Sequence, residues 1–173
     1  YFLGSADAPL TLTMFEDFQC PHCLAFTLGN EHVIIEEYVL TGKVRLEFQN
    51  LPILGQDSVN AAFAAHCMAA GDLFWPFQRE LFAAQARAGP LTNEQLNIGR
   101  FDVEPLTTMA VNAGADEDDF TACLVDTATR DALVAQGQRA TTKGLSGTPA
   151  FLLNGIPIVT PRDPDGWRDL LGD

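Results

Sequence analysis

Positive charge is scarce in this sequence of 173 residues. Ten lysines and arginines stand against 23 aspartates and glutamates, and the formal net charge is −13 at pH 7. The basic residues are scattered along the chain and form no stripe that would neutralise a row of phosphates. Nucleic acid is therefore not an expected partner. The excess of acidic side chains instead indicates a well-solvated surface.

Long apolar runs and internal repeats are also missing. No apolar run reaches the roughly 20 residues of a membrane-spanning helix, and no segment recurs at a fixed period, which excludes a solenoid. No signal peptide is visible, and the chain opens at Tyr1 rather than Met. We therefore expect a processed or trimmed form whose missing segment cannot be read. Hydrophobic residues make up 47% of the sequence, enough for one packed domain, with or without an insertion.

Two strands and a helix are expected in the first third of the chain. Apolar and polar residues alternate in the stretches 9–18 and 43–53, which predicts two strands. The residues between them, roughly 20–40, have helical periodicity that ends at Gly42. Strand, helix and strand in this order form a βαβ unit, so the two strands should be parallel.

The rest of the chain predicts a group of helices and then a hairpin. Helices are expected over 61–70, 74–89 and 128–143, with Asp102 and Asp116 as N-caps of two more and a capping box at 91–96. Asn154 and Gly155 lie between two apolar runs in 148–160, which predicts a β-hairpin. A short helix is expected over about 163–171. The terminal parts should therefore share one small sheet, with a helical subdomain between them.

Cysteines are few, and two of the four lie in the stretch "CPHC", where Cys20 and Cys23 flank Pro21 and His22. A structural metal site would need a matching second pair of ligands, and His66, Cys67 and Cys123 have irregular spacing. A c-type haem needs His directly after the second cysteine, where this chain has Leu24. A structural disulfide between the pair would close almost no loop, so it would add little stability.

Redox exchange fits the close pair better than these alternatives. At the first turn of a helix, free backbone N–H groups and the helix dipole stabilise a thiolate. We expect Cys20 to be the exposed attacking sulfur, with Pro21 at the first helical position and His22 adding stabilisation. Cys23 lies one turn further along, and we expect it to be less exposed and to resolve the mixed disulfide on Cys20.

A second part of the site is expected at "SGTPAF", where Pro149 stands at the start of a strand. An ordinary trans peptide bond is the commoner state of an X-Pro pair. A cis bond would turn the backbone of Thr148 toward the cysteine pair and offer its N–H and C=O to a substrate strand. Composition leaves both states open.

Four segments together resemble the DsbA-like branch of the thioredoxin superfamily. They are "DAPLTLTMFEDFQCPHC", "FWPFQRELFAAQ", "FTACL" and "GLSGTPAFLLNG", and the resemblance runs from about Gly4 to the C-terminal helix. It implies an α/β thioredoxin fold, a central mixed sheet flanked by helices, with an inserted helical domain. The thioredoxin-like domain would comprise 1–55 plus 140–173, and the insertion 56–139.

The resemblance also implies what the chain does. It implies a periplasmic or otherwise extracytoplasmic enzyme, a monomer without cofactor or metal, that oxidises dithiols of unfolded clients. Cys20, Pro21, His22 and Cys23 would form the redox centre, and Thr148 with Pro149 a cis-proline loop that binds substrate. A membrane partner of the DsbB or VKOR type would reoxidise the pair. A disulfide isomerase or a thioredoxin-like reductase would use the same site.

The other two cysteines have a different expected role. In an oxidising compartment, and by similarity to relatives with Cys in "FxxCL", Cys67 and Cys123 are expected to form a structural disulfide rather than remain buried thiols. His66 is expected to be a solvated helix residue, and the aromatic residues Phe74, Trp75 and Phe77 to pack the core of the insertion.

One position departs from the family pattern. Thioredoxin-like relatives often carry a buried carboxylate six residues before the first cysteine, and this chain has Met14 there. Glu16 and Asp17 are nearby, and we expect them to be solvated or capping carboxylates rather than proton carriers. Two other classes stay open: a chaperone-like binding protein with a structural CxxC, and a glutathione transferase of the same fold. The retained cysteine pair argues against the transferase.

Overall fold

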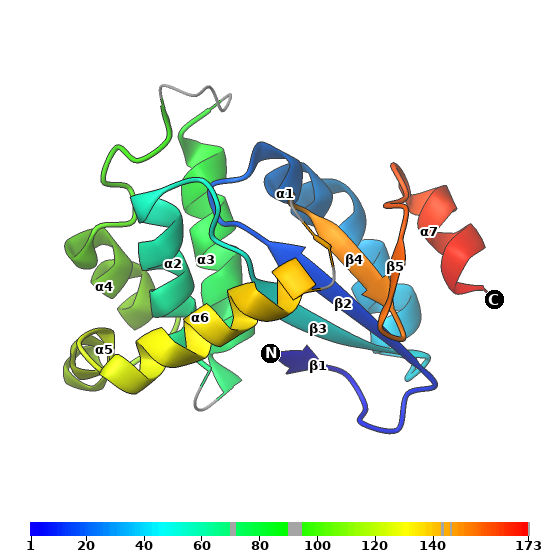
Figure 1. Ribbon diagram of the computed structural model, residues 1–173, viewed down its shortest axis with the longest axis horizontal. Coiled ribbons are helices and arrows are strands. Elements are labelled where there is room, and N and C mark those ends of the chain that lie inside the picture. The colour runs from blue at the N-terminus through cyan, green and yellow to red at the C-terminus, as the bar shows by residue number, and fades with distance from the viewer. Residues whose placement is uncertain (70–71, 90–94, 143, 146, 173) are drawn as a thin grey trace.

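The computed structural model describes residues 1–69, 72–89, 95–142, 144–145 and 147–172, and its centre is a mixed five-stranded sheet (Figure 1). The strands are β1 (Phe2–Leu3), β2 (Leu10–Glu16), β3 (Val44–Asn50), β4 (Ala150–Leu153) and β5 (Ile156–Ile158), in the order β1-β3-β2-β4-β5. The central pair β2 and β3 is parallel, as the βαβ pattern predicts, and the other pairs are antiparallel. This is the α/β thioredoxin-like architecture expected from the sequence.

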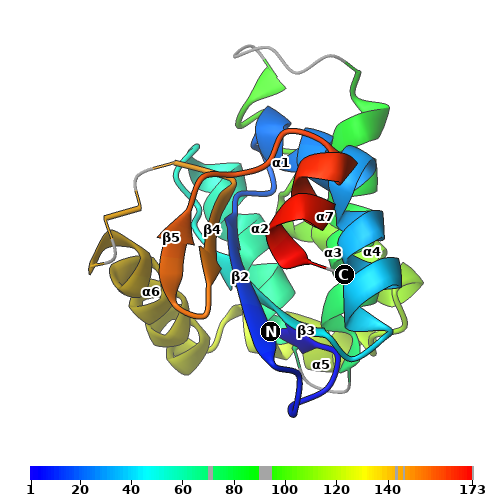
Figure 2. The ribbon, with the colours of Figure 1, turned by 90° about the vertical axis from the view of Figure 1, so that its right-hand side faces the viewer.

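Helices cover both faces of the sheet and form the insertion. They are α1 (Pro21–Phe26), η1 (Thr27–Glu31), η2 (Ile34–Val39), α2 (Gln56–Cys67), α3 (Phe74–Arg87), α4 (Val103–Asn112), α5 (Glu117–Leu124), α6 (Thr127–Thr142) and α7 (Pro164–Leu171). The predicted helix over 20–40 is α1 followed by two π-helical segments. The start of the predicted capping box, 91–94, lies outside the described residues. Figure 2 shows α6 on one side of the sheet and α1 and α7 on the other.

The alternation of side chains along the strands divides the core between the two faces. Leu12 and Met14 of β2 are fully buried in the large cluster that also contains the apolar residues of α1 and α7. Phe15, one position out of phase, packs on the opposite face with Ala140 of α6 and Leu152 of β4. Successive strand residues point to opposite faces of the sheet. The last residue of β2, Glu16, therefore lies on the same face as Leu12 and Met14.

The insertion is fixed to the sheet by aromatic residues. Phe74 and Trp75 of α3 lie 4.9 and 6.4 Å from the Phe48 ring of β3, measured between ring centroids. The Trp75 indole N–H donates to the carbonyl of Phe2 over 3.0 Å. Phe77 is buried, as expected. Phe74 and Trp75 are buried too, but they pack against the sheet as well as the insertion.

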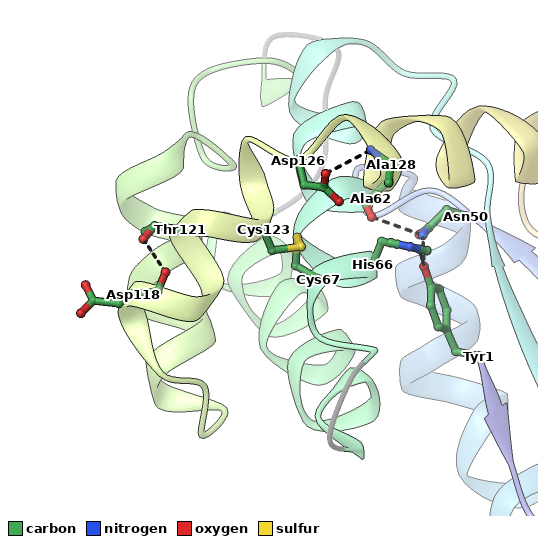
Figure 3. Close-up of a disulfide and its surroundings, with 10 residues drawn as sticks. All are labelled: Tyr1, Asn50, Ala62, His66, Cys67, Asp118, Thr121, Cys123, Asp126 and Ala128. Carbon is green, nitrogen blue, oxygen red and sulfur yellow. Dashed lines mark hydrogen bonds between the residues drawn. A yellow bond between two sulfur atoms is a disulfide. The ribbon is translucent and has the colours of Figure 1, made fainter.

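A disulfide joins two helices within the insertion. Cys67 at the end of α2 and Cys123 in α5 are bonded, with their Cα atoms 5.8 Å apart (Figure 3). Beside it, His66 is half-buried, and its Nδ1 lies 2.6 Å from the hydroxyl of Tyr1. Burial lowers the pKa of this imidazole. The expectation of a solvated His66 was therefore wrong, because Tyr1 packs against this part of α2.

The predicted hairpin forms where Asn154 and Gly155 stand. Their φ angles are +49° and +80°, the pair of positive values that a type I′ turn requires. The Asn154 side chain also accepts a hydrogen bond from the backbone N–H of Thr11 over 2.8 Å, which ties the turn to β2. The strand β1 was not predicted, because two residues carry no periodicity of their own.

Candidate active site

The cysteine pair lies where β2 gives way to α1. Cys20 is the N-cap of α1 with extended backbone angles, and Pro21 occupies the first turn, where its missing N–H costs nothing. The Cys20 backbone is held by a hydrogen bond from its N–H to the Asp17 carbonyl over 2.9 Å. Both cysteines of the pair are free thiols. The sulfur of Cys20 therefore lies at a helix N-terminus, as the CxxC spacing predicts.

Cys23 is less exposed than Cys20, as expected, but Cys20 is more buried than expected. Cys20 is 4% exposed and Cys23 is 0% exposed, so the expectation of an exposed Cys20 was wrong. The reason is the loop that contains Thr148, because the Thr148 carbonyl oxygen lies 3.3 Å from Cys20 Sγ. The dipeptide between the cysteines, Pro21 and His22, is exposed. Access to Cys20 therefore runs along His22 and the Thr148 loop.

The environments of the two sulfurs push their pKa values in opposite directions. A hydrogen bond from the Cys23 side chain contributes most to lowering the pKa of Cys20 to about 6, against the opposing effect of burial. The Thr148 side chain and the backbone N–H groups of Cys23 and His22 lower it further. Burial raises the pKa of Cys23 well above its ordinary value. At neutral pH the proton is therefore held by Cys23, and Cys20 is the thiolate.

The loop opposite the cysteine pair comes from the far end of the chain. The peptide bond between Thr148 and Pro149 is cis, and these two residues precede β4, which pairs with β2. The pairing of β4 with β2 brings Thr148 to Cys20 although 128 positions separate them. The structure therefore places the expected site residues at neighbouring strand ends. They are Cys20, Pro21, His22 and Cys23 after β2, and Thr148 and Pro149 before β4.

Asp17, which lies three residues before Cys20, is buried and fully used as a hydrogen-bond acceptor. Its Oδ1 accepts from the Gln19 N–H over 2.8 Å and from the Ser58 hydroxyl over 2.6 Å. Its Oδ2 accepts from the N–H groups of Ile53 and Leu54 over 2.7 and 3.0 Å. The expectation of a solvated or capping carboxylate was wrong for Asp17, which is buried and caps neither α1 nor α2. Its carboxylate instead joins the segment after β2, the loop after β3 and α2.

Glu16 is the candidate site residue that the sequence analysis misjudged. It is 0% exposed, and neither carboxyl oxygen has a hydrogen-bond partner among the described residues. Burial, together with the charges of Glu31 and Cys20, raises the pKa of this carboxyl well above its ordinary value. The expectation of a solvated carboxylate was wrong for Glu16. The signal was present, because Glu16 continues the buried phase of Leu12 and Met14.

A second buried carboxyl, Glu31 in η1, interacts with Glu16. Glu31 is 5% exposed and accepts a hydrogen bond from the Gln78 amide over 3.1 Å. Burial raises its pKa to about 7. The charge of Glu16, in turn, contributes to the raised pKa of Cys23. Two buried carboxyls with raised pKa values therefore lie on the same face of the sheet as Cys23.

A groove of about 360 Å³ opens beside the cysteine pair. One wall is formed by His22 and Phe26 of α1 and Asn30 of η1. The other is the Thr148–Pro149 loop with the segment Thr160–Arg162 after β5. Within the part of the chain that the structure describes, no three His, Cys, Asp or Glu side chains cluster as metal ligands do. Nor does any described helix have the length and apolar character needed to cross a membrane.

Comparison with known proteins identifies the family. A fold with this sheet order, a helical insertion and a cysteine pair at the start of α1 is thioredoxin-like, and the whole chain, residues 1–173, matches a family model described as thioredoxin. The chain therefore belongs to this thioredoxin family. Among curated proteins it resembles the probable disulfide bond formation protein D of Bacillus anthracis, with 37% identity over 87 residues. That match covers 49% of this chain and 40% of the relative's length.

Solved structures share the fold over nearly the whole chain. The oxidised crystal structure of BdbD from Bacillus subtilis superposes with a TM-score of 0.83 at 23% identity, covering 98% of this chain and 89% of that one. Wolbachia pipientis α-DsbA1 gives a TM-score of 0.80 at 21% identity, with 98% and 87% covered. At these identities the likeness concerns the fold, including the helical insertion formed by α2–α5.

Proposed function

We propose that this protein is a thiol-disulfide oxidoreductase that oxidises dithiols of client proteins through Cys20 and Cys23. The observation that carries the proposal is the opposite shift of the two sulfur pKa values at one helix N-terminus. The disulfide bond formation proteins among its relatives support the same class of reaction. Cys20 is the sulfur that forms the mixed disulfide, and Thr148 with Pro149 lies where a client strand would pass.

Client oxidation proceeds in two exchanges. A client thiolate attacks Sγ of Cys20 in the oxidised protein, a mixed disulfide forms, and Cys23 leaves with the electron pair of the broken bond. A second client thiolate then attacks the client sulfur of the mixed disulfide, and Cys20 leaves as a thiolate. The client loses two electrons, and the cysteine pair gains them. The low pKa of Cys20, about 6, makes it a good leaving group in this second exchange.

Reoxidation uses Cys23 as the resolving sulfur. The Cys20 thiolate attacks a partner disulfide, and Cys23 then attacks Cys20 and releases the reduced partner. We propose a membrane partner of the DsbB or VKOR type for this step. Cys23 must lose its proton here and regain one in client oxidation, and we propose that Glu16 exchanges this proton. The buried, unpartnered carboxyl on the same face of the sheet supports this role.

The oxidising direction follows from the same electrostatics. Stabilising the Cys20 thiolate favours the dithiol form of the protein, so the disulfide form is a strong oxidant. An isomerase or a reductase would use the same residues, with the reduced pair as the working form. We further propose an extracytoplasmic location and a monomer acting on reduced, unfolded clients, without a bound cofactor. His22 and Pro21, both exposed beside Cys20, would contact the client.

The reduction potential of the Cys20–Cys23 pair tests the proposal, measured by equilibration with glutathione. We expect a value between about −120 and −180 mV, and a value near about −270 mV would indicate a reductase instead. Alkylation of Cys20 should have its midpoint near pH 6, because the reactive thiolate predominates above the pKa and is protonated below it. Cys20→Ser should abolish client oxidation, whereas a chaperone with a structural CxxC would keep its activity.

A further inference from the structure

The groove beside Cys20 differs in charge from the rest of the molecule. The protein carries a formal charge of −13, yet no carboxylate is among the described residues that line this groove. Its titratable side chains are His22 and Arg162. This groove beside the cysteine pair therefore carries a cationic side chain and no carboxylate, although the molecule as a whole is acidic.

Arg162 is not committed to any internal partner. Within the described residues it takes part in no ion pair and donates no side-chain hydrogen bond, and its side chain is exposed. Arg168, six residues further on, contrasts with it, because its guanidinium binds Glu37 and Asp165 over 2.6 and 2.8 Å. A guanidinium with five free N–H donors is suited to a carboxylate from outside the chain.

The groove adjoins the reacting sulfur through Thr148. Thr148 contributes both the carbonyl that lies 3.3 Å from Cys20 Sγ and part of the groove wall. A client joined to Cys20 by a mixed disulfide therefore places the residues next to its cysteine along His22 and toward Arg162. Asn30 lines the same groove, and its Oδ1 is buried without a partner among the described residues. A client N–H could supply that partner.

We propose that this groove selects clients that carry an aspartate or glutamate next to the reactive cysteine, with Arg162 binding the carboxylate. The inference rests on the proposed oxidase function and names its preferred substrate class. The net charge of the protein acts in the opposite sense and repels acidic clients at long range. That repulsion is screened beyond about 8 Å at physiological ionic strength, so the contact with Arg162 decides among bound clients.

Three dithiol peptides that differ only beside their cysteines, with aspartate, glutamine or lysine there, test the proposal. The rate constant for oxidation by the disulfide form is measured for each peptide in 0.15 M salt. Each rate is divided by that peptide's rate with hydroxyethyl disulfide, which removes the effect of flanking charge on the client thiol itself. The quantity compared between variants is the aspartate-to-lysine ratio of these corrected rates.

We expect the ratio to change in the Arg162 variants and to stay unchanged in the control variant. Arg162→Gln should lower it about two- to fivefold, the range of an exposed ion pair, and Arg162→Glu should lower it further. Arg139→Gln is the matched control, because it changes the net charge equally from a different groove. Equal ratios in wild type and Arg162→Gln, or an equal change in both variants, would overturn the inference alone. Failure of the wild type to oxidise any peptide would overturn the proposed function with it.

Discussion

At the scale of single residues, the site depends on how two similar thiols are made different. Cys20 receives hydrogen bonds from groups around it, and Cys23 is buried among apolar side chains. Each unit of difference between the two pKa values corresponds to about 1.4 kcal/mol. Because the pKa of Cys20 is lowered and that of Cys23 is raised, the proton resides on Cys23 and is not shared between the sulfurs. A buried carboxyl beside such a pair can supply or remove protons without admitting water.

Glu16→Gln tests this carboxyl. The substitution keeps the shape of the side chain but removes its titration. The reoxidation rate should therefore fall by at least about tenfold, a smaller loss than the roughly hundredfold or more that a positioned acid or base typically contributes. The pKa of Cys23 should also fall, because the charge of Glu16 helps to raise it, and carbon chemical shifts of Cys23 would report this. Glu36→Gln, on the exposed face of η2, is the control. An unchanged pKa and rate would contradict the proposed proton carrier.

The reacting residues could be predicted from the sequence, but the burial of the side chains around them could not. The CxxC spacing and the distal "TPAF" identify residues that meet, because those motifs carry their own local geometry. The burial of Glu16 was misjudged, since acidic residues are seldom fully buried without a partner. Only the phase of the β2 alternation, which places Glu16 beneath α1 and η1, indicated otherwise.

At the scale of elements, Asp17 links three segments that could otherwise move independently. Its carboxylate accepts hydrogen bonds from the loop after β3 and from Ser58 of α2. Nearby, the Gln19 side chain donates to the same Ser58 hydroxyl over 2.9 Å, and its carbonyl accepts from the Asn97 N–H. The segment that leads into Cys20 is thereby tied to the insertion.

Asp17→Asn should therefore destabilise the protein substantially. The amide that replaces one oxygen would face backbone N–H donors, and losing charged acceptors at buried donors costs about 3 kcal/mol. Urea unfolding would measure this loss in the free energy of unfolding. Asp7→Asn, at an exposed position, provides the control and should change stability little. A loss below about 0.5 kcal/mol would show that these hydrogen bonds are replaced by water.

The elements themselves were predicted where their signals are local. The βαβ unit, the Asn154-Gly155 hairpin and the cap at Asp116, whose side chain accepts from two backbone N–H groups, all follow from short patterns. β1 and the π-helical turns do not. Phe2 and Leu3 become a strand only because Glu47 and Leu46 are opposite, and no alternation in the sequence reports such a partner.

At the scale of the whole molecule, the insertion is stabilised separately from the sheet. The bond between Cys67 and Cys123 spans 56 positions and closes a loop that contains α3 and α4. We propose the division expected from the resemblance, with 56–139 as the insertion and the flanking segments as the thioredoxin-like part. The described contacts that cross this boundary include the ring contacts of Phe74 and Trp75 with Phe48 and the hydrogen bond from Ser58 to Asp17.

Replacing both cysteines tests how much the closed loop contributes. Cys67→Ala with Cys123→Ala should lower the free energy of unfolding by about 4 kcal/mol, the chain-entropy value for a loop of this length. Urea unfolding of the double variant would measure the loss. The matched control is Cys20→Ala with Cys23→Ala, which leaves this loop closed. A loss in the control as large as in the test variant would contradict the assignment of stability to the loop.

The contact between Cys20 and Thr148 also sets an order in time. The two residues are 128 positions apart, and a ribosome delivers the cysteine pair long before it delivers the loop that completes the site. A chain interrupted between Cys23 and Thr148 carries both thiols but lacks the carbonyl that contacts Cys20 and the Thr148 side chain that helps to lower its pKa. Full redox competence is therefore a property of a finished chain, and a half-made copy of this protein is chemically closer to a client than to an enzyme.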